Sequence, residues 1–579
     1  MKRAYLSVAL LTLAACGGGD DNSDAQTAAV TEQLPPWTEF AATTIDEYYR
    51  QNPEQAVDAG LHEYDGRASD WSLAAMQAYA AWLQSTIDDA RMYTDLAGIE
   101  AFEREYLAQA LGSQLFWISD SGFATKNPVA YARRIGVSVY VDRDYAPLDV
   151  RLRAYTEYVS NVPRMLQQMR GNLQPPLPAP YVEMGHRILA GFAEYLEGTV
   201  PGMFGSVDDE DLQLQFAFVN EAAAVAVRET ADWLEGLKGT ATQDYALGED
   251  LFLQMIRETQ GLDISLADLK AAGQADLDRN LATLFEACAE FAPGESTEDC
   301  VLKVQNRKPP EGAVGGATRQ LPGIKQFIVD NDIVSIPGTE EALVGEAPPH
   351  RRFNFAYIEI PGPFEQGLPS VYYIAPPDPS WSEEDQLAYV AGETDLLATS
   401  IHEVWPGHFL QFLHANRTEN NVGRHFGTYS YIEGWAHYTE QMMLDAGFGD
   451  GDPEVRIGQL LNALLRNVRY MSAIGLHAEG MTVEESQAMF ENQAFQDFGN
   501  ASQQAYRGTY DPGYLNYTLG KLMINKLRED WTTGRGGREA WGRFHDQFLN
   551  YGSPPVPLIR KEMLGEDYEG DTALLPNQD

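Results

Sequence analysis

The chain has 579 residues, and its 85 Asp and Glu against 41 Lys and Arg give a formal net charge of −44. With 44% hydrophobic and 11% aromatic residues it is too rich in core-forming side chains to be a disordered acidic polymer, so a folded protein is expected. The charge argues against nucleic-acid binding, which needs an excess of Lys and Arg, and against docking of the protein surface on an anionic membrane.

The N-terminal segment resembles a bacterial export signal. Lys2 and Arg3 give it a positive start, and the apolar run Ala4–Leu13 is too short to span a bilayer. The run ends in Leu13-Ala14-Ala15-Cys16, which resembles a lipobox, so we expect residues 1–15 to be removed and Cys16 to be lipidated. Residues 16–35 then form a flexible tether, and the protein sits in the bacterial cell envelope, on the periplasmic face, touching the membrane through the lipid alone. An ordinary signal peptide with an incidental cysteine is the alternative.

Residues 36–305 carry the repeating pattern of amphipathic helices. Apolar residues recur about every 3.6 positions between Pro- and Gly-rich breaks, which predicts an N-terminal helical region. The predicted helices cover Phe40–Tyr49, Leu73–Ile87, Ala101–Phe116, Leu152–Met169, Glu183–Tyr195 and Leu212–Leu237. Cys288 and Cys300 are expected to pair in a disulfide, because an exported protein meets an oxidising environment. Two free buried thiols are the alternative.

The pattern changes over residues 306–350. Repeated Pro and Gly pairs predict a long irregular connection there. In the following region, 351–579, two β-like pieces, Phe353–Ile360 and Val371–Ile374, precede helix signals that run from Asp395 nearly to the end. The expected fold is therefore mainly α-helical, with a small sheet in front of the C-terminal helices.

Histidines cluster in the C-terminal region. Half of the ten lie within 36 residues, near carboxylates, and both groups are good zinc ligands: His402, His408, His414, His425 and His437. The stretch from His402 to His408 is similar to the His-Glu-x-x-His helix of zinc peptidases, but its second histidine comes two places late. On a continuous helix the two imidazoles diverge, whereas a break at Pro406-Gly407 brings them together. A helix end with two unrelated histidines is the alternative.

A second helix is predicted around residues 431–440. Glu433, His437 and Glu440 fall on one face of it, and aromatic side chains fall on the opposite face. Gly434 indicates close approach of another backbone. Glu433 follows His402 by 31 residues, a suitable distance for a third ligand from a neighbouring antiparallel helix. A merely solvated acidic face is the alternative.

Basic and phenolic side chains come next along the chain. Arg466 and Arg469 share one stripe of a predicted helix, and His477 joins them if the helix runs that far. Tyr514 and Tyr517 lie in a turn leading into another helix, where their phenols are able to donate to an oxyanion. Surface ion pairs for each Arg and simple packing for each Tyr are the alternatives.

Together these pieces resemble the DUF885 family of bacterial proteins, which are often lipoproteins. The family pattern HExxPGHxxQ matches His402–Gln411, EGWAxYxE matches Glu433–Glu440, and a Gly-x-His element matches Gly475–Thr482. Two departures stand out: Tyr517 lies one place short of the family's position after Pro-Gly, and Ala473-Ile474 replaces a frequent Asp-Thr. The resemblance covers nearly the whole mature chain.

The resemblance implies a large helical architecture like that of the gluzincin zinc peptidases, with a central cleft. It implies one Zn²⁺ per chain, held by His402, His408 and Glu433, with Glu440 as the support of a ligand histidine or as the rival third ligand. Glu403 would be the general base, and His477 with Tyr514 or Tyr517 would stabilise the oxyanion. A peptide would lie along a sheet edge, for which Val371–Ile374 is the expected strand.

The expected function is therefore an exported, lipid-anchored zinc peptidase that hydrolyses peptide bonds. Arg466 and Arg469 are the expected holders of a substrate carboxylate or an oxyanion. Two alternatives remain open: an inactive binding lipoprotein on the same scaffold, and a metal-dependent amidase acting on cell-wall fragments.

Overall fold

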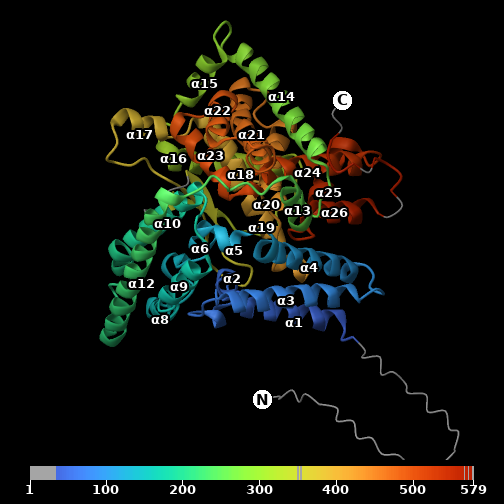
Figure 1. Cartoon of the computed structure of the whole chain (residues 1–579). Coiled ribbons are helices and arrows are strands. Elements are labelled where there is room, and N and C mark those ends of the chain that lie inside the picture. Colours follow the sequence, from blue (N-terminus) through green and yellow to red (C-terminus); the bar gives the residue numbers. More distant parts are fainter. Residues whose placement is uncertain (1–33, 349–350, 353–354, 566–567, 572, 577–579) are drawn as a thin grey trace, which may run out of the picture. The chain divides into compact units, whose positions relative to one another are not determined.

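Helices account for most of the molecule and form where the sequence shows the helical period, which confirms the mainly α prediction (Figure 1). This computed structural model describes residues 34–348, 351–352, 355–565, 568–571 and 573–576, and residues 37–579 belong to one compact unit. The predicted signal, Cys16 and all but the last two residues of the predicted tether lie outside the described residues. None of the described helices is both long and apolar enough to cross a membrane.

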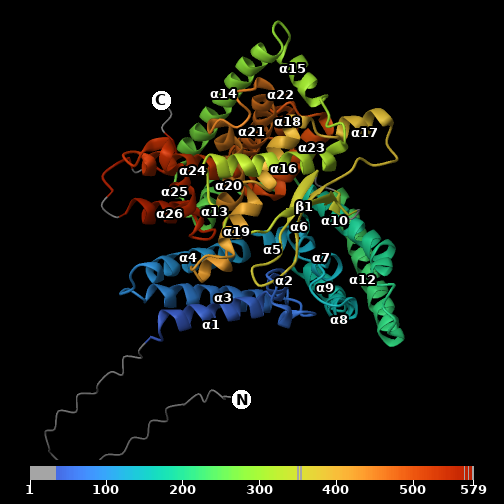
Figure 2. The same cartoon turned by 180° about the vertical axis from the view of Figure 1, so that it is seen from behind.

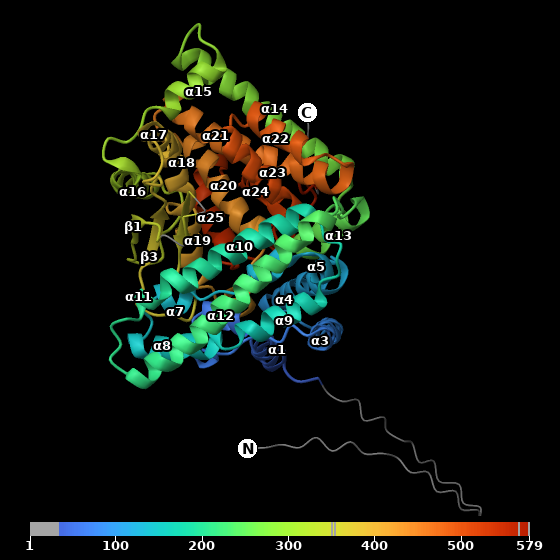
Figure 3. The same cartoon turned by 60° about the vertical axis from the view of Figure 1, so that its left-hand side comes forward.

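The first part of the chain builds a core rich in aromatic side chains, among them Trp37, Tyr106 and Tyr155. The predicted helix over 152–169 is two helices, because Pro163 favours the first turn of a new helix over the middle of an old one. The helices are α1 (Trp37–Gln51), α2 (Pro53–Asp58), α3 (Leu73–Arg91), α4 (Ile99–Leu115), α5 (Phe123–Lys126), α6 (Pro128–Ala132), α7 (Ser138–Asp142), α8 (Leu148–Val159), α9 (Val162–Asn172), α10 (Ala179–Gly198), α11 (Val200–Met203) and α12 (Glu210–Leu237). Helices α10 and α12 pack along each other (Figure 3).

The rest of the chain builds a second core, in which α20 lies along α24 and α21 packs against α14 and α18. Apart from Phe116, its buried residues begin in α13, earlier than the connection that we expected to divide the chain. The helices are α13 (Glu249–Gln260), α14 (Leu266–Phe291), α15 (Thr297–Gln305), α16 (Gly312–Asp330), α17 (Glu383–Tyr389), α18 (Glu393–Glu403), α19 (His408–Ala415), α20 (Tyr429–Asp445), α21 (Pro453–Ile474), α22 (Val483–Gln493), α23 (Phe498–Tyr510), α24 (Asn516–Thr532), α25 (Trp541–Leu549) and α26 (Val556–Leu564).

The expected irregular connection over 306–350 is wrong in its middle, which is the 19-residue helix α16. Ala317, Leu321, Ile324 and Ile328 recur at helical spacing and are buried against the second core. That burial outweighs the loss of one backbone hydrogen bond at Pro322, which lies inside the helix. Tertiary packing thus overrides the local signal of Pro and Gly.

A three-stranded sheet lies beside these helices (Figure 2). Its strands are β1 (Ala342–Glu346), β2 (Ala356–Glu359) and β3 (Ser370–Ile374), in the order β1-β3-β2. β3 is parallel to β1 and antiparallel to β2. The expectation that Val371–Ile374 is a sheet edge is therefore wrong, because β3 is paired on both sides; β1 and β2 are the edges. β1 was not predicted, since it lies within the Pro- and Gly-rich stretch over 306–350.

The predicted disulfide joins Cys288 near the end of α14 to Cys300 in α15. Both residues are buried in the second core. The bond closes the turn of the α14–α15 hairpin, which stands at the top of Figure 1.

A partly buried ion-pair network fastens the sheet to the first helices. Arg143 pairs with Glu359 of β2 at 2.8 Å, with Glu365 at 3.3 Å and with Asp58 at 3.2 Å. His62 adds contacts to Asp65 at 3.1 Å and Glu365 at 3.5 Å, and its ring stacks on Tyr145 with centroids 3.7 Å apart. The two cores are therefore linked by charges as well as by apolar contacts.

His62 gives this link a pH dependence. Burial lowers the pKa of His62, but the contacts with Asp65 and Glu365 outweigh burial and raise it to about 9. Protonated His62 therefore stabilises the fold fully below its ordinary pKa near 6.5, and this stability is lost as pH rises through 9. We expect His62→Phe to cost about 1–2 kcal/mol at pH 6, allowing for the partial exposure of the side chain, and almost nothing at pH 9.5. Urea unfolding at both pH values checks this, and a pH-independent cost would contradict it.

Candidate metal centre

His402 and His408 meet because the helix between them is broken. α18 ends at Glu403 and α19 begins at His408, as the Pro406-Gly407 pair predicted. The two imidazole centroids are 4.8 Å apart. Gly407 is required at the break, since a Cβ there would lie 1.8 Å from the carbonyl oxygen of His402. Both histidines are buried or nearly so, with 4% and 9% exposure.

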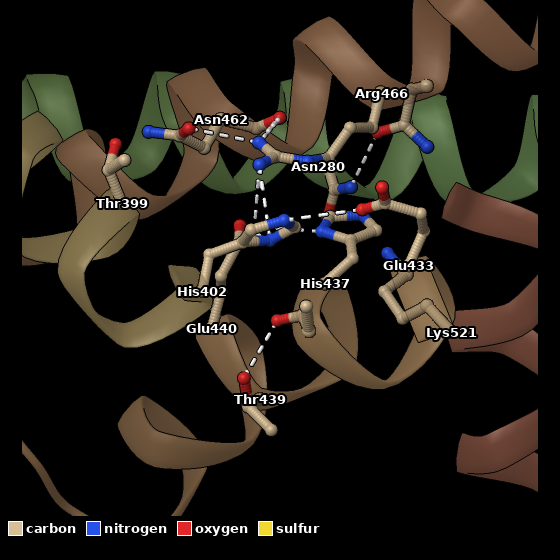
Figure 4. A network of polar contacts seen from close by, with 12 residues as sticks. Asn280, Thr399, His402, Glu433, His437, Thr439, Glu440, Asn462, Arg466 and Lys521 are labelled. Atoms are coloured by element: carbon tan, nitrogen blue, oxygen red, sulfur yellow. Dashed lines mark hydrogen bonds and ion pairs between the residues drawn. The ribbon is translucent and has the colours of Figure 1, made fainter. Parts of the chain in front are cut away.

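Glu433 completes the group from α20. Its Oε2 atom lies 3.4 Å from Nε2 of His402 and 3.4 Å from Nε2 of His408, and one ligand atom from each of the three residues falls within 4.8 Å of the others (Figure 4 shows Glu433 beside His402). Burial would raise the pKa of Glu433, but the two histidines hold it well below its usual range. An ionised carboxylate thus faces two imidazole nitrogens, and the predicted trio comes together.

Glu440 occupies the other side of His402. Its Oε1 atom accepts from Nδ1 of His402 at 2.7 Å, and Arg466 lies 3.2 Å from the same oxygen (Figure 4). Burial would raise the pKa of Glu440, but Arg466, His437 and His402 lower it. This carboxylate therefore fixes the ring of His402 and leaves Nε2 facing Glu433, the arrangement of a support rather than of a third ligand. Arg466 is committed to Glu440 and to Asn462, so it is not free to hold a substrate.

Glu403 lies at the end of α18, next in sequence to His402. Its Oε2 atom accepts a hydrogen bond from the backbone N–H of Ile358 in strand β2, at 3.0 Å. The edge strand of the sheet therefore positions this carboxylate, with 9% of the residue exposed. The sequence placed Glu403 beside the trio, but its contact with β2 depends on tertiary structure.

Tyr517 also belongs to this site. Its ring lies nearly parallel to that of His402, with centroids 6.4 Å apart, and it is surrounded by three guanidinium groups. The guanidinium carbon of Arg469 is 4.9 Å from the ring centroid, and those of Arg466 and Arg507 are each 5.9 Å away. Arg507 was not predicted from the sequence as a residue of this site. It pairs with Asp511 at 3.0 Å, and the four-residue spacing of this pair on a helix was an available signal.

His477 and Tyr514 are not at the site, contrary to their predicted roles. Nε2 of His477 hydrogen-bonds the carbonyl of Gly508 at 2.7 Å, its ring stacks on Phe252, and burial lowers its pKa to about 4. The Tyr514 hydroxyl donates to Ser472 at 2.7 Å. The described residues show no contact of either with the trio. A π-helical turn, Gly475–Glu479, follows α21 and changes the helical phase, so His477 leaves the stripe of Arg466 and Arg469.

Helix α20, which carries Glu433, packs against α24 at two glycines. A Cβ on Gly434 would lie 2.5 Å from the Cα of Gly520, and a Cβ on Gly520 would lie 1.8 Å from the carbonyl oxygen of Ser430. The close approach predicted from Gly434 is thus confirmed. It sets the depth at which Glu433, the next residue, enters the site.

Gly434→Ala should therefore push the two helices apart. We expect a loss of about 1–3 kcal/mol in the free energy of unfolding, the usual cost of overpacking, together with weaker metal binding through the displaced Glu433. Gly191→Ala is the matched control: Gly191 lies in α10 with nothing within 4 Å of a new Cβ, so it should be neutral or stabilising. Chemical unfolding of both variants checks this, and an unchanged Gly434→Ala would contradict it.

Comparisons with known proteins agree with the resemblance. A structure described as a "putative lipoprotein of unknown function from Shewanella oneidensis" has a TM-score of 0.78 at 23% identity, covering 92% of this chain and 100% of that one. A "putative lipoprotein from Colwellia psychrerythraea" has a TM-score of 0.78 at 17% identity, covering 91% and 98%. No curated protein matches. The family model described as "Bacterial protein of unknown function (DUF885)" matches residues 53–563. This chain therefore belongs to the DUF885 family.

Proposed function

We propose that this protein is a zinc-dependent peptidase, exported and anchored to the cell envelope by a lipid on Cys16. The observation that carries the proposal is the meeting of His402, His408 and Glu433, with the carboxylate of Glu403 next to them in the chain. The sequence signal at Leu13–Cys16 supports the anchor, as do the descriptions of the two similar structures as lipoproteins.

The residues present fit zinc. Two imidazole nitrogens and one carboxylate oxygen are a common protein ligand set of catalytic zinc sites. Within the described ranges, Oε2 of Glu433 is a buried atom without a hydrogen bond, as expected of an oxygen that coordinates a metal ion. A zinc ion held by these three residues supplies a Lewis acid for the scissile carbonyl and lowers the pKa of water.

The chain's own groups provide the rest of the chemistry. Glu403, positioned by Ile358, takes a proton from the attacking water as its oxygen bonds to the carbonyl carbon. The carbon–nitrogen bond then breaks, and Glu403 returns that proton to the leaving amine. Tyr517, whose ring lies beside that of His402, would donate to the carbonyl oxygen through its phenol. Glu440 and Arg466 keep the ring of His402 in one orientation.

Metal analysis and a substrate panel test this proposal. The purified protein should hold about one zinc per chain, and the His402→Ala variant should lose it because one ligand is gone. His414→Ala is the control, since His414 bonds the carbonyl of Ser335 outside the trio. Zinc-loaded protein should then cleave members of a peptide library. Failure to hold zinc would contradict the proposal. Cleavage of cell-wall fragments alone would indicate that the substrate is a cell-wall amide and not a peptide.

A further inference from the structure

Among the residues that the structure describes, Arg469 is a buried cation without a carboxylate partner. Only 8% of the residue is exposed, and its Nε donates to the neutral side chain of Gln504 at 2.9 Å. Across the described part of the chain Arg469 forms no ion pair, whereas its neighbours Arg466 and Arg507 pair with Glu440 and Asp511. Burial, and then the nearby Arg507, lower the pKa of Arg469, as expected for a charge that lacks compensation.

This lack of a partner is informative because acids are abundant. The chain has 85 Asp and Glu for 41 Lys and Arg, yet no acidic side chain that the structure describes forms an ion pair with this guanidinium. A buried charge without a partner costs free energy unless something else neutralises it. Within the described residues neither terminal nitrogen of Arg469 donates a hydrogen bond to the protein, and neither is among the buried side-chain atoms that lack a hydrogen-bond partner. They are therefore reachable from solvent and free to bind an anion.

The position of Arg469 indicates which anion. Its guanidinium carbon is 4.9 Å from the ring centre of Tyr517, and that ring centre is 6.4 Å from the ring centre of His402. An extended peptide advances about 3.3–3.6 Å per residue. The two distances together put the guanidinium carbon of Arg469 no more than about 11 Å from the ring centre of His402. Once the contacts at the two ends of the substrate are allowed for, a carboxylate on Arg469 would belong to a residue one or two positions beyond a carbonyl held at the trio. A guanidinium also binds a carboxylate through two parallel hydrogen bonds.

We propose that Arg469 binds the C-terminal carboxylate of the substrate, so that the enzyme removes one or two residues from the C-terminus of a peptide. The proposal rests on the peptidase function above and adds the substrate class to it. Gln504 positions the guanidinium through Nε and leaves both terminal nitrogens to the ligand. The basic group around Tyr517 is thus a receptor for a free chain end, and Arg466 and Arg507, being paired, are its supports.

Binding measurements test the carboxylate site separately from turnover. The probes are an N-acetylated dipeptide and its C-terminal amide, titrated calorimetrically into zinc-loaded protein carrying Glu403→Gln to prevent cleavage. The free acid should bind about tenfold to a hundredfold tighter than the amide, the usual contribution of hydrogen bonds to a charged group. Adding Arg469→Gln should bring the two affinities together. Arg228→Gln, which removes an exposed pair with Glu197, should leave the preference unchanged.

Gln504→Glu is the sharper variant. Its new carboxylate would stand 2.9 Å from Nε of Arg469 and provide the missing partner from within the protein. This variant should fold with unchanged or higher stability and should also lose the preference for the free acid. Equal binding of acid and amide by the parent protein, or a preference that survives both Arg469→Gln and Gln504→Glu, would overturn the inference.

The outcomes for function and for specificity are distinct. Equal cleavage of free and amidated peptides at internal bonds would leave the peptidase standing and overturn the role of Arg469. If the protein cleaves no peptide but prefers the free acid through Arg469, the carboxylate site would stand and the peptidase function would be overturned.

Discussion

Glu403→Gln is expected to lower kcat on a cleaved peptide by about a hundredfold to ten-thousandfold while zinc content stays at one per chain. The amide of Gln keeps the size of the side chain and its acceptor oxygen for the N–H of Ile358, which lies 3.0 Å from the carboxylate in the parent protein. It cannot take a proton from water at neutral pH. Glu403 contributes none of the three atoms of the trio, so the metal should remain. Zinc analysis and steady-state kinetics on the same preparation provide the measurement.

Two further variants make that result specific. Glu479→Gln changes an exposed glutamate that pairs with Lys270, and it should leave both zinc content and kcat unchanged. Glu433→Gln should instead lose zinc, because it removes a charged ligand. If Glu403→Gln kept the parent kcat, Glu403 would not be the base. If it lost zinc as well, Glu403 would be acting as a ligand.

Lys521→Met is expected to cost about 3 kcal/mol in the free energy of unfolding. Nζ of Lys521 lies 2.5 Å from Oδ2 of Asp276, and both side chains are almost completely buried where α24 meets α14. Burial would raise the pKa of Asp276, but Lys521 and Arg279 lower it, so the carboxylate is ionised in the fold. Removing the lysine leaves that charge short of its main partner, which costs about 3–5 kcal/mol in buried pairs. Arg279 and Asn467 still contact Asp276, so the lower value is expected.

A double variant and an exposed pair complete the measurement. Lys521→Met combined with Asp276→Asn removes both charges and should recover part of the loss, because the two changes are coupled. Lys270→Met breaks the exposed pair with Glu479 and should cost less than about 1 kcal/mol. Urea unfolding of the variants gives these differences. Equal costs for the buried and the exposed pair would refute the assigned role of Lys521.

Local chemistry explains why much of the site was predictable. Pro406 cannot continue a helical hydrogen-bond ladder, and Gly407 permits the approach of a carbonyl. The seven residues from His402 to His408 therefore determine the helix break that brings the two histidines together. Glu433 and Glu440 lie seven residues apart on one helix, which places both on the same face. The helical period likewise determined most helices of the first core, since burial of one face depends on spacing along the chain.

Other features depend on contacts between distant segments, and only the tertiary structure decided them. The local pattern of β3 is the same at an edge as between two strands, and the partners β1 and β2 decide its place. The sequence does not distinguish Tyr514 from Tyr517 as a site residue. In the structure the hydroxyl of Tyr514 is hydrogen-bonded to Ser472, away from the site, whereas the ring of Tyr517 lies beside that of His402. Arg466 and Arg469 share one helix face, yet Glu440 provides a counter-charge for Arg466, whereas Arg469 meets the neutral side chain of Gln504. Spacing along one helix specifies a face, whereas the charge that meets it comes from a neighbouring helix.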